Sequence, residues 1–146
     1  MKVFLSHSAK AAGLARKAAG VLREQGLEVW LAEEQVMPGD NYATLIGEAL
    51  NSCDAMVVLL TPDKDDAQMT NYDMIYALGA PNYRQKVFPL IVASHESMAV
   101  TKSLVPWIFM GTTQTVRPAE LAAKLKIIAQ RLGPASESSA SVAAAR

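Results

Sequence analysis

The hexapeptide "AMVVLL", residues 55–60, is continuously apolar and decides the fold class. The polar stretches "NSCD" and "TPDKDD" flank it, so the apolar run has the length of a strand. A strand without a polar alternate face is buried on both sides, which is typical of parallel sheets covered by helices. The stretch therefore predicts an α/β protein.

Further apolar runs on either side of this hexapeptide predict the other strands. They are residues 3–5, 27–31, 87–92 and, as a weaker candidate, 105–109. The segments between them carry apolar residues at helical spacing. In the last segment one side is lined by Leu121, Leu125, Ile128 and Leu132. Strands that alternate with helices predict a parallel sheet with helices on both faces.

Capping and turn residues set the expected ends of these elements. Ser8 is expected to cap the first helix and Gly26 to end it in a left-handed conformation. Asp40 is the expected N-cap of the second helix, after a polar loop "AEEQVMPGD" at residues 32–40. Pro89 inside the run 87–92 predicts an edge strand or a bulge.

Length and composition restrict the class of protein. The 146 residues predict one domain over 1–132 and a disordered, Ala/Ser-rich tail over 133–146. A formal net charge of zero argues against nucleic acid or an anionic membrane as a partner. No stretch reaches the ~18 apolar residues that span a bilayer, and the first run is too short for a signal peptide. We therefore expect a soluble, cytoplasmic protein.

Several motifs follow one another in an order that resembles a known family. "VFLSHS" (3–8) precedes an amphipathic segment, "GLEVWL" (26–31) and a loop ending in "MPGD" (37–40). "ALNSCDAMVVLLTP" (49–62) and "NYDMIYALGAPNYRQKVFPLIV" (71–92) come next. In this order and spacing, residues 1–132 resemble a Toll/interleukin-1 receptor (TIR) domain of the bacterial type.

Three boxes of the TIR family have counterparts in this chain. "VFLSHS" resembles the first box, Pro38-Gly39 the second, and Pro106-Trp107 more weakly the third. The resemblance implies a flavodoxin-like, three-layer fold with a five-stranded parallel sheet between helices.

The resemblance also implies one of two functions. Many bacterial TIR domains cleave the nicotinamide–ribose bond of NAD, with NAD as substrate and without a cofactor. Others act only by assembling with partner TIR domains. The leading expectation is a NAD nucleosidase in defence or virulence signalling that forms homo-oligomers on activation. The alternative is a non-catalytic adaptor that works through TIR–TIR self-association.

The resemblance assigns candidate residues to the site. The catalytic glutamate of the enzymes falls on Asp73, and the tryptophan four residues earlier falls on Met69, so both positions depart from the family pattern. The other implied substrate contacts are Ser6, His7, Ser8, Gly39, Asp40 and Asn41. The implied self-association loop contains Glu33, Glu34, Met37, Pro38 and Gly39.

Asp73 also has a purely structural explanation. Thr70 and Asp73 have the spacing of a capping box, with Thr70 as N-cap and Asp73 at the third helical position. A carboxylate there interacts favourably with the helix dipole. The sequence leaves open whether Asp73 caps a helix, contacts a substrate, or does both.

Structural roles are expected for three further residues. Trp30 is assigned to core packing and Cys53 to an inert buried thiol. His7 is either an acid or base of the site or a hydrogen-bonding loop residue. No residues have the spacing of a zinc site, so no metal is expected.

Two other classes of protein share this type of sheet. A phosphate-acceptor receiver domain needs an acidic pair after the first strand, where this chain has Ser-His-Ser. A nucleoside deoxyribosyltransferase shares the doubly wound sheet and the N-glycosidic chemistry. The loop with Pro38-Gly39 favours the TIR resemblance over this rival.

Overall fold

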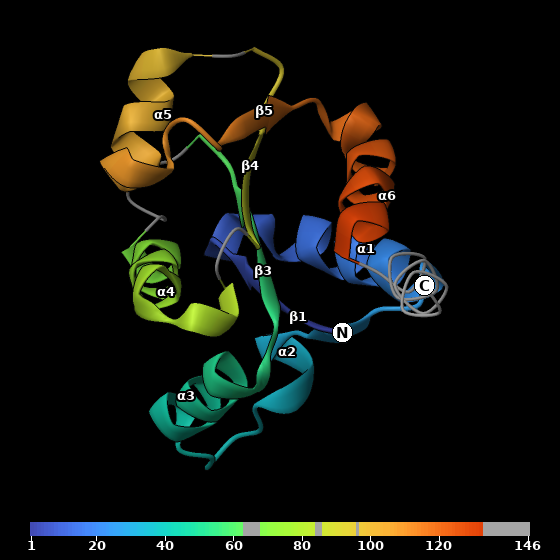
Figure 1. Cartoon of the computed structure of the whole chain (residues 1–146), viewed down its shortest axis with the longest axis vertical. Coiled ribbons are helices and arrows are strands. Elements are labelled where there is room, and N and C mark those ends of the chain that lie inside the picture. Colours follow the sequence, from blue (N-terminus) through green and yellow to red (C-terminus); the bar gives the residue numbers. More distant parts are fainter. Residues whose placement is uncertain (63–67, 84–85, 96, 133–146) are drawn as a thin grey trace, which may run out of the picture.

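The computed structural model describes residues 1–62, 68–83, 86–95 and 97–132, and these form a three-layer α/β protein (Figure 1). Within them, five strands pair in parallel in the order β2-β1-β3-β4-β5. The strands are β1 (Lys2–His7), β2 (Glu28–Trp30), β3 (Ala55–Leu60), β4 (Val87–Val92) and β5 (Gln114–Val116). The predicted flavodoxin-like fold with a five-stranded parallel sheet is confirmed.

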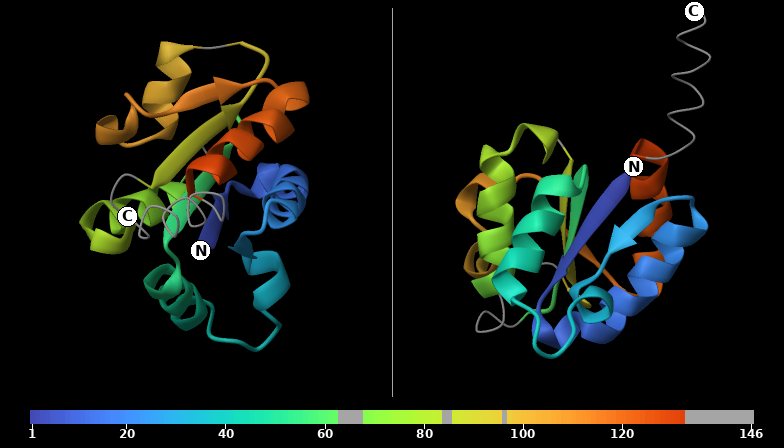
Figure 2. Two further views of the ribbon diagram at one scale, coloured as in Figure 1. Left: turned by 45° about the vertical axis from the view of Figure 1, so that its right-hand side comes forward. Right: turned by 90° about the horizontal axis from the view of Figure 1, so that it is seen from below.

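Helices cover both faces of the sheet (Figures 1 and 2). One face carries α1 (Ala12–Glu24) and α6 (Leu121–Leu132). The other face carries α3 (Tyr42–Ser52), α4 (Gln68–Gly79) and α5 (Met98–Leu104). A single-turn helix, α2 (Ala32–Gln35), follows β2. Four 3-10 turns complete the described elements: η1 (Ala9–Ala11), η3 (Pro81–Tyr83), η4 (Trp107–Phe109) and η5 (Pro118–Glu120).

The central strand β3 explains why its sequence lacks alternation. All six of its residues are buried, because it pairs with β1 and β4 and has helices on both faces. Ala55, Val57 and Leu59 pack under α1 and α6. Met56, Val58 and Leu60 pack under α3, α4 and α5. The apolar hexapeptide thus supplies both cores at once.

Pro89 lies in an interior strand, so the predicted edge strand or bulge is wrong. β4 pairs with β3 along its length but with β5 only from Leu90 onward. The Ala93 amide donates to the Val116 carbonyl, so by alternation the Pro89 nitrogen faces the same side. The missing N–H of Pro89 therefore points to a stretch where the β5 ladder has not yet begun, and it breaks no hydrogen bond with β5.

The predicted strand at 105–109 is also wrong, because part of this segment forms η4 instead. Val105 and Phe109, which are four residues apart, are buried, whereas Trp107 between them is 80% exposed. This is helical rather than strand spacing. The fifth strand lies further on, at Gln114–Val116, where three residues were too few to recognise.

Element ends differ from the sequence predictions in three places. The N-cap of α3 is Asn41, whose side chain accepts a 3.1 Å hydrogen bond from the Thr44 amide, and not Asp40. Residues 32–35 of the expected polar loop form α2. Ser8 is followed by η1, and α1 begins only at Ala12 without a side-chain cap. Gly26, with a φ of 90°, follows the first helix as predicted.

Helix α4 begins at Gln68, so the predicted capping box is wrong. Thr70 is the third residue of the helix and fully buried, and Asp73 is the sixth. The face toward the sheet consists of Thr70, Met74 and Ala77. Ile75 and Leu78, which are apolar, are each 55% exposed. Capping therefore does not explain the carboxylate of Asp73.

Candidate active site

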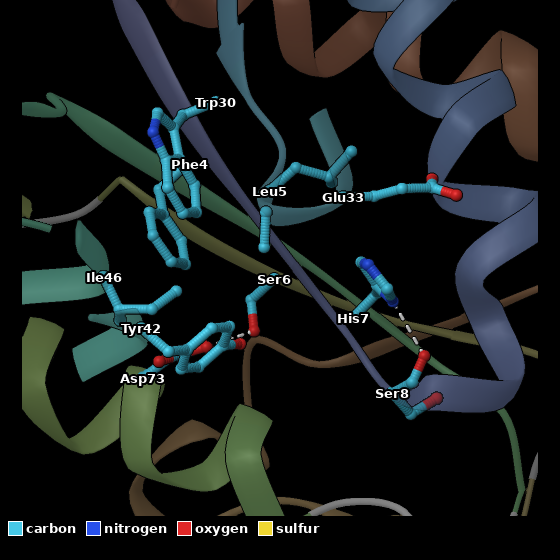
Figure 3. A pocket seen from close by; sticks show the side chains of 11 residues that line it. Phe4, Leu5, Ser6, His7, Ser8, Trp30, Glu33, Tyr42, Ile46 and Asp73 are labelled. Atoms are coloured by element: carbon cyan, nitrogen blue, oxygen red, sulfur yellow. Dashed lines mark hydrogen bonds between the residues drawn. The ribbon is translucent and has the colours of Figure 1, made fainter. Parts of the chain in front are cut away.

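A cavity of about 300 Å³ opens at the carboxyl ends of β1 and β2 (Figure 3). The chain order reverses between β1 and β3, and open α/β sheets bind ligands at such a switch point. We call it the β1 cavity and define it by its lining: Phe4, Leu5, Ser6, His7, Ser8, Trp30, Ala32, Glu33, Tyr42, Ile46 and Asp73.

Asp73 of α4 and Ser6 of β1 meet in the β1 cavity, although 67 positions separate them in the sequence. The Ser6 hydroxyl, in a residue that is 4% exposed, donates a 2.6 Å hydrogen bond to Asp73 Oδ2. Burial raises the pKa of Asp73 from 3.8 to about 6, against the lowering effects of the Ser6 hydrogen bond and of the His7 charge. The carboxylate is therefore fixed in place and mostly ionised at neutral pH.

His7 and Ser8 continue the lining beyond Ser6. His7 Nδ1 lies 2.8 Å from the Ser8 carbonyl oxygen, which can only accept, so Nδ1 carries the proton and Nε2 is left for other partners. The Ser8 side chain is 2% exposed, and its hydroxyl has no hydrogen-bond partner in the described part of the chain. A buried hydroxyl without a partner is unfavourable.

Aromatic side chains form another part of the wall of the β1 cavity. Trp30 is 8% exposed and stacks on Phe4 with ring centroids 5.1 Å apart, so the predicted packing role is confirmed and the stacked pair also serves as a wall. Tyr42 is the first residue of α3 and is 46% exposed. Burial and the charge of Asp73 raise the pKa of its phenol. In Figure 3 the Tyr42 ring lies beside Asp73.

Helix α2 forms the remaining wall and is tied to α1 by two ion pairs. Glu33 lies 2.5 Å from Arg16, and Glu34 accepts two hydrogen bonds from Arg23, one of them 2.9 Å long. The hydrogen bond from Arg23 lowers the pKa of Glu34. Figure 3 shows the Glu33 carboxylate directed toward α1 and away from Asp73. Both acids are thus engaged within the chain.

Other predicted site residues do not line the β1 cavity. Asp40 accepts a 2.8 Å hydrogen bond from the Met37 amide, and Asn41 caps α3. Gly39, with a φ of 93°, lies in the exposed turn between Met37 and Asp40. The Met37 side chain is 63% exposed. The side chain of Met69 lies outside the described part of the chain. The structure therefore brings together Ser6, His7, Ser8 and Asp73 but not Gly39, Asp40 and Asn41.

Sequence reasoning assigned Glu33 a different role, in the self-association loop. It missed five residues that line the cavity: Phe4, Leu5, Ala32, Tyr42 and Ile46. The position of Tyr42 in the sequence did indicate that it could reach the cavity. A helix that follows the second strand begins at the carboxyl edge of the sheet, which is the edge where Ser6 lies. An aromatic residue in the first turn of that helix is a candidate for the same cavity.

Cys53 takes no part in this site. Cys53 is buried, and burial raises the pKa of its thiol to about 11, as expected for an unreactive packed residue.

Among the described residues, no three His, Cys, Asp or Glu side chains are grouped so that they could hold a metal ion. The described helices also include none that is long and apolar enough to cross a membrane.

Strand order and cavity together define a class: a flavodoxin-like α/β domain with the partly buried carboxylate of Asp73 at its switch point. The sequence comparison specifies the family. A family model described as TIR domain matches residues 3–125, and the chain belongs to that family. A comparison with curated proteins found no match.

Solved structures share the fold. One of them is a 2-deoxyribosyltransferase from the psychrotolerant bacterium Bacillus psychrosaccharolyticus, with 22% sequence identity and a TM-score of 0.50. The match covers 71% of this chain and 82% of that one. This likeness concerns the arrangement of the sheet and helices only.

Proposed function

We propose that this TIR domain cleaves the nicotinamide–ribose bond of NAD, with NAD as substrate and no cofactor. The observation that carries the proposal is the Asp73 carboxylate, which Ser6 holds inside the β1 cavity by a 2.6 Å hydrogen bond. We also propose a cytoplasmic role in defence or virulence signalling.

A partly buried carboxylate suits this reaction. When the glycosidic bond breaks, its electron pair neutralises the nicotinamide nitrogen, so the leaving group needs no proton. Positive charge then develops on the ribose as in other oxocarbenium-like transition states. An ionised Asp73 stabilises this charge, and more strongly in a partly desolvated cavity than in water. Water completes the reaction at the ribose carbon and releases its proton.

Aspartate in place of the family glutamate affects the position of the charge. Asp73 is one methylene shorter, and a displacement of ~1 Å can cost on the order of a hundredfold in rate. The hydrogen bond from Ser6 limits such losses because it fixes one carboxylate oxygen.

We expect Asp73→Glu to raise the cleavage rate at least about tenfold, because the longer side chain extends further into the cavity. Unchanged cleavage in Asp73→Glu would show that another departure, such as Met69, limits the site.

The direct test is nicotinamide release from NAD by the purified chain, at high protein concentration and on a crowding surface. Asp73→Asn is the matched control, since it keeps the shape of the side chain and an oxygen that Ser6 can bond, and removes only the charge. We expect release by the wild type and background release by Asp73→Asn. Equal release by both proteins in both conditions would refute the enzymatic proposal.

The second candidate function is a non-catalytic adaptor that self-associates. The observation that favours it is the loop around Pro38 and Gly39, whose Met37 side chain is 63% exposed. Charge reversal at Glu33 or Glu34 is a poor test, because it also breaks the ion pairs to α1. Met37→Asp changes the loop surface alone. An adaptor predicts loss of assembly in this variant, measured by sedimentation, and no NAD cleavage in any variant.

A further inference from the structure

We propose that the β1 cavity takes the cationic riboside half of its substrate alone, so that nicotinamide riboside is cleaved without the rest of the dinucleotide. This inference rests on the proposed NAD cleavage and specifies its substrate class: ribosides of a positively charged nitrogen base. The diphosphate and adenosine of NAD then remain outside the cavity.

Among the described residues, the charges that line the cavity favour a cation over a diphosphate. Among the described lining residues there is no lysine or arginine, and Asp73 is the lining acid that faces the cavity, since Glu33 is paired with Arg16. Arg16 approaches the wall only to pair with Glu33, at 2.5 Å, and does not line the cavity. A diphosphate placed inside would lose its hydration without gaining a cationic partner, which is strongly unfavourable.

The aromatic residues point to the same kind of ligand. Phe4, Trp30 and Tyr42 line the cavity, and Tyr42 lies beside the Asp73 carboxylate (Figure 3). Aromatic rings together with a carboxylate are the usual recognition elements for a quaternary nitrogen, which cannot donate a hydrogen bond. The pyridinium of nicotinamide riboside is a flat cation of this type.

Size and polarity also fit one nucleoside. The volume of about 300 Å³ lies at the lower end of ligand pockets, which suits a nucleoside better than a dinucleotide. His7 lines the cavity and leaves Nε2 as an acceptor for a neutral ribose hydroxyl. The cavity thus combines aromatic side chains for the base with polar groups for the sugar.

The proposed reaction is a hydrolysis. The bond between ribose C1 and the pyridinium nitrogen breaks, and its electron pair stays on the nitrogen, so that neutral nicotinamide leaves. Water bonds to C1 and gives up one proton to Asp73 or to solvent. The products are ribose and nicotinamide, and the reaction needs no oxidant or reductant.

The activity test compares nicotinamide release from nicotinamide riboside and from NAD by the full chain. We expect kcat/KM values within about tenfold of each other, because the parts outside the cavity add little binding energy. Asp73→Asn is expected to abolish both activities. Cleavage of NAD with no cleavage or binding of nicotinamide riboside would overturn this inference and leave the proposed function standing.

A binding test separates failure of this inference from failure of the proposed function. Calorimetry with nicotinamide riboside and with its uncharged dihydro form compares two ligands of nearly the same shape that differ by one charge. We expect the cation to bind at least about tenfold more tightly, and Asp73→Asn to reduce that preference to about twofold. Glu48→Gln, which removes an exposed acid outside the cavity, is the control and should keep the preference.

The binding result tests the substrate class even if neither substrate is cleaved. A preference for the cation then supports the substrate class although the cleavage proposal has failed. Equal affinities for the two forms, or no binding of either by the wild type, would overturn the inference. The comparison of the two ligands on the wild-type protein does not depend on whether any variant folds.

Discussion

Asp73 carries a charge that the fold makes unfavourable. Its pKa is raised from 3.8 to about 6, mainly by burial, so the folded protein binds this proton more tightly than the unfolded chain. The folded state is therefore favoured at low pH, and this advantage is lost as pH rises through about 6. A residue that costs stability at neutral pH and has no capping role is typical of a functional site.

Asp73→Asn should therefore stabilise the protein at neutral pH. The expected gain in the free energy of unfolding is about 1–3 kcal/mol near pH 7.5, with little gain near pH 4, where the carboxyl is protonated when folded. Denaturant unfolding at both pH values measures it. A gain of the same size at both would mean that the charge is not the cause.

Burial raises the pKa of Asp73, and the hydrogen bond from Ser6 reduces that rise. NAD cleavage that needs ionised Asp73 should rise with pH around a midpoint of about 6. Ser6→Ala removes a hydrogen bond that lowers the pKa, so the midpoint should move upward, by about one pH unit. The rate between about pH 5 and pH 8 measures this. A midpoint that stays in place would show that Ser6 does not act through Asp73.

Other titratable groups lie near Asp73. Among the described residues they are Tyr42 of α3, His7 of β1 and Tyr83 of η3, and all three interact with its charge. His7→Gln removes a positive charge that lowers the same pKa, so it should shift the midpoint in the same direction as Ser6→Ala. A shift from Ser6→Ala alone would assign the effect to the hydrogen bond.

At the scale of elements, the wall formed by α2 depends on contacts with α1. Arg23 binds both Glu34 and the Val29 carbonyl, the latter at 3.0 Å. These partners hold the four-residue α2, which is too short to be stable alone. The order of α2, and with it one wall of the β1 cavity, therefore comes from α1 and not from its own sequence.

Arg23→Gln should lower the free energy of unfolding by about 0.5–1 kcal/mol, because it removes a two-pronged but partly exposed ion pair. Arg117→Gln is the matched control. Arg117 is 3.8 Å from Glu120, and both side chains are more than 60% exposed (72% and 63%). Thermal melting of both variants measures the difference. An equal effect of the two substitutions would contradict a structural role for Arg23.

At the scale of the whole molecule, α6 closes one core of the sheet. Its predicted buried side was correct: Leu121, Leu125, Ile128 and Leu132 are each no more than 5% exposed. They pack with α1 over β1 and β3. The boundary predicted after residue 132 is not tested by these contacts, and residues 133–146 lie outside the described part of the chain.

Truncation tests that boundary. A chain that ends after Leu132 should keep the stability of the full chain within about 1 kcal/mol and cleave NAD at the same rate. A chain that ends after Glu120 should not fold, because it loses a helix whose apolar side is part of the core. Circular dichroism and thermal melting distinguish these results. A large loss in the first truncation would refute the proposed boundary.

Local signals predicted some elements well and others poorly. β3 and α6 were recognisable because their apolar patterns repeat over enough residues to fix a period. β5 has only three residues, which are too few to show a period. In α4 the apolar residues Ile75 and Leu78 are exposed, so its apolar residues do not mark its buried face. The start of α4 was misplaced because Thr70 and Asp73 have capping-box spacing, whereas packing against the sheet buries Thr70 inside the helix.

The sequence by itself determined the parallel sheet, its covering helices and the edge at which Ser6, His7 and Ser8 lie. These follow from apolar periodicity, which is a local property of the chain. Only the tertiary structure decided what Asp73 does. It brings α4 against β1, pairs Asp73 with Ser6, and adds Tyr42 from α3 to the same cavity. The pKa of Asp73 depends on this packing, because desolvation arises only when distant segments exclude water together.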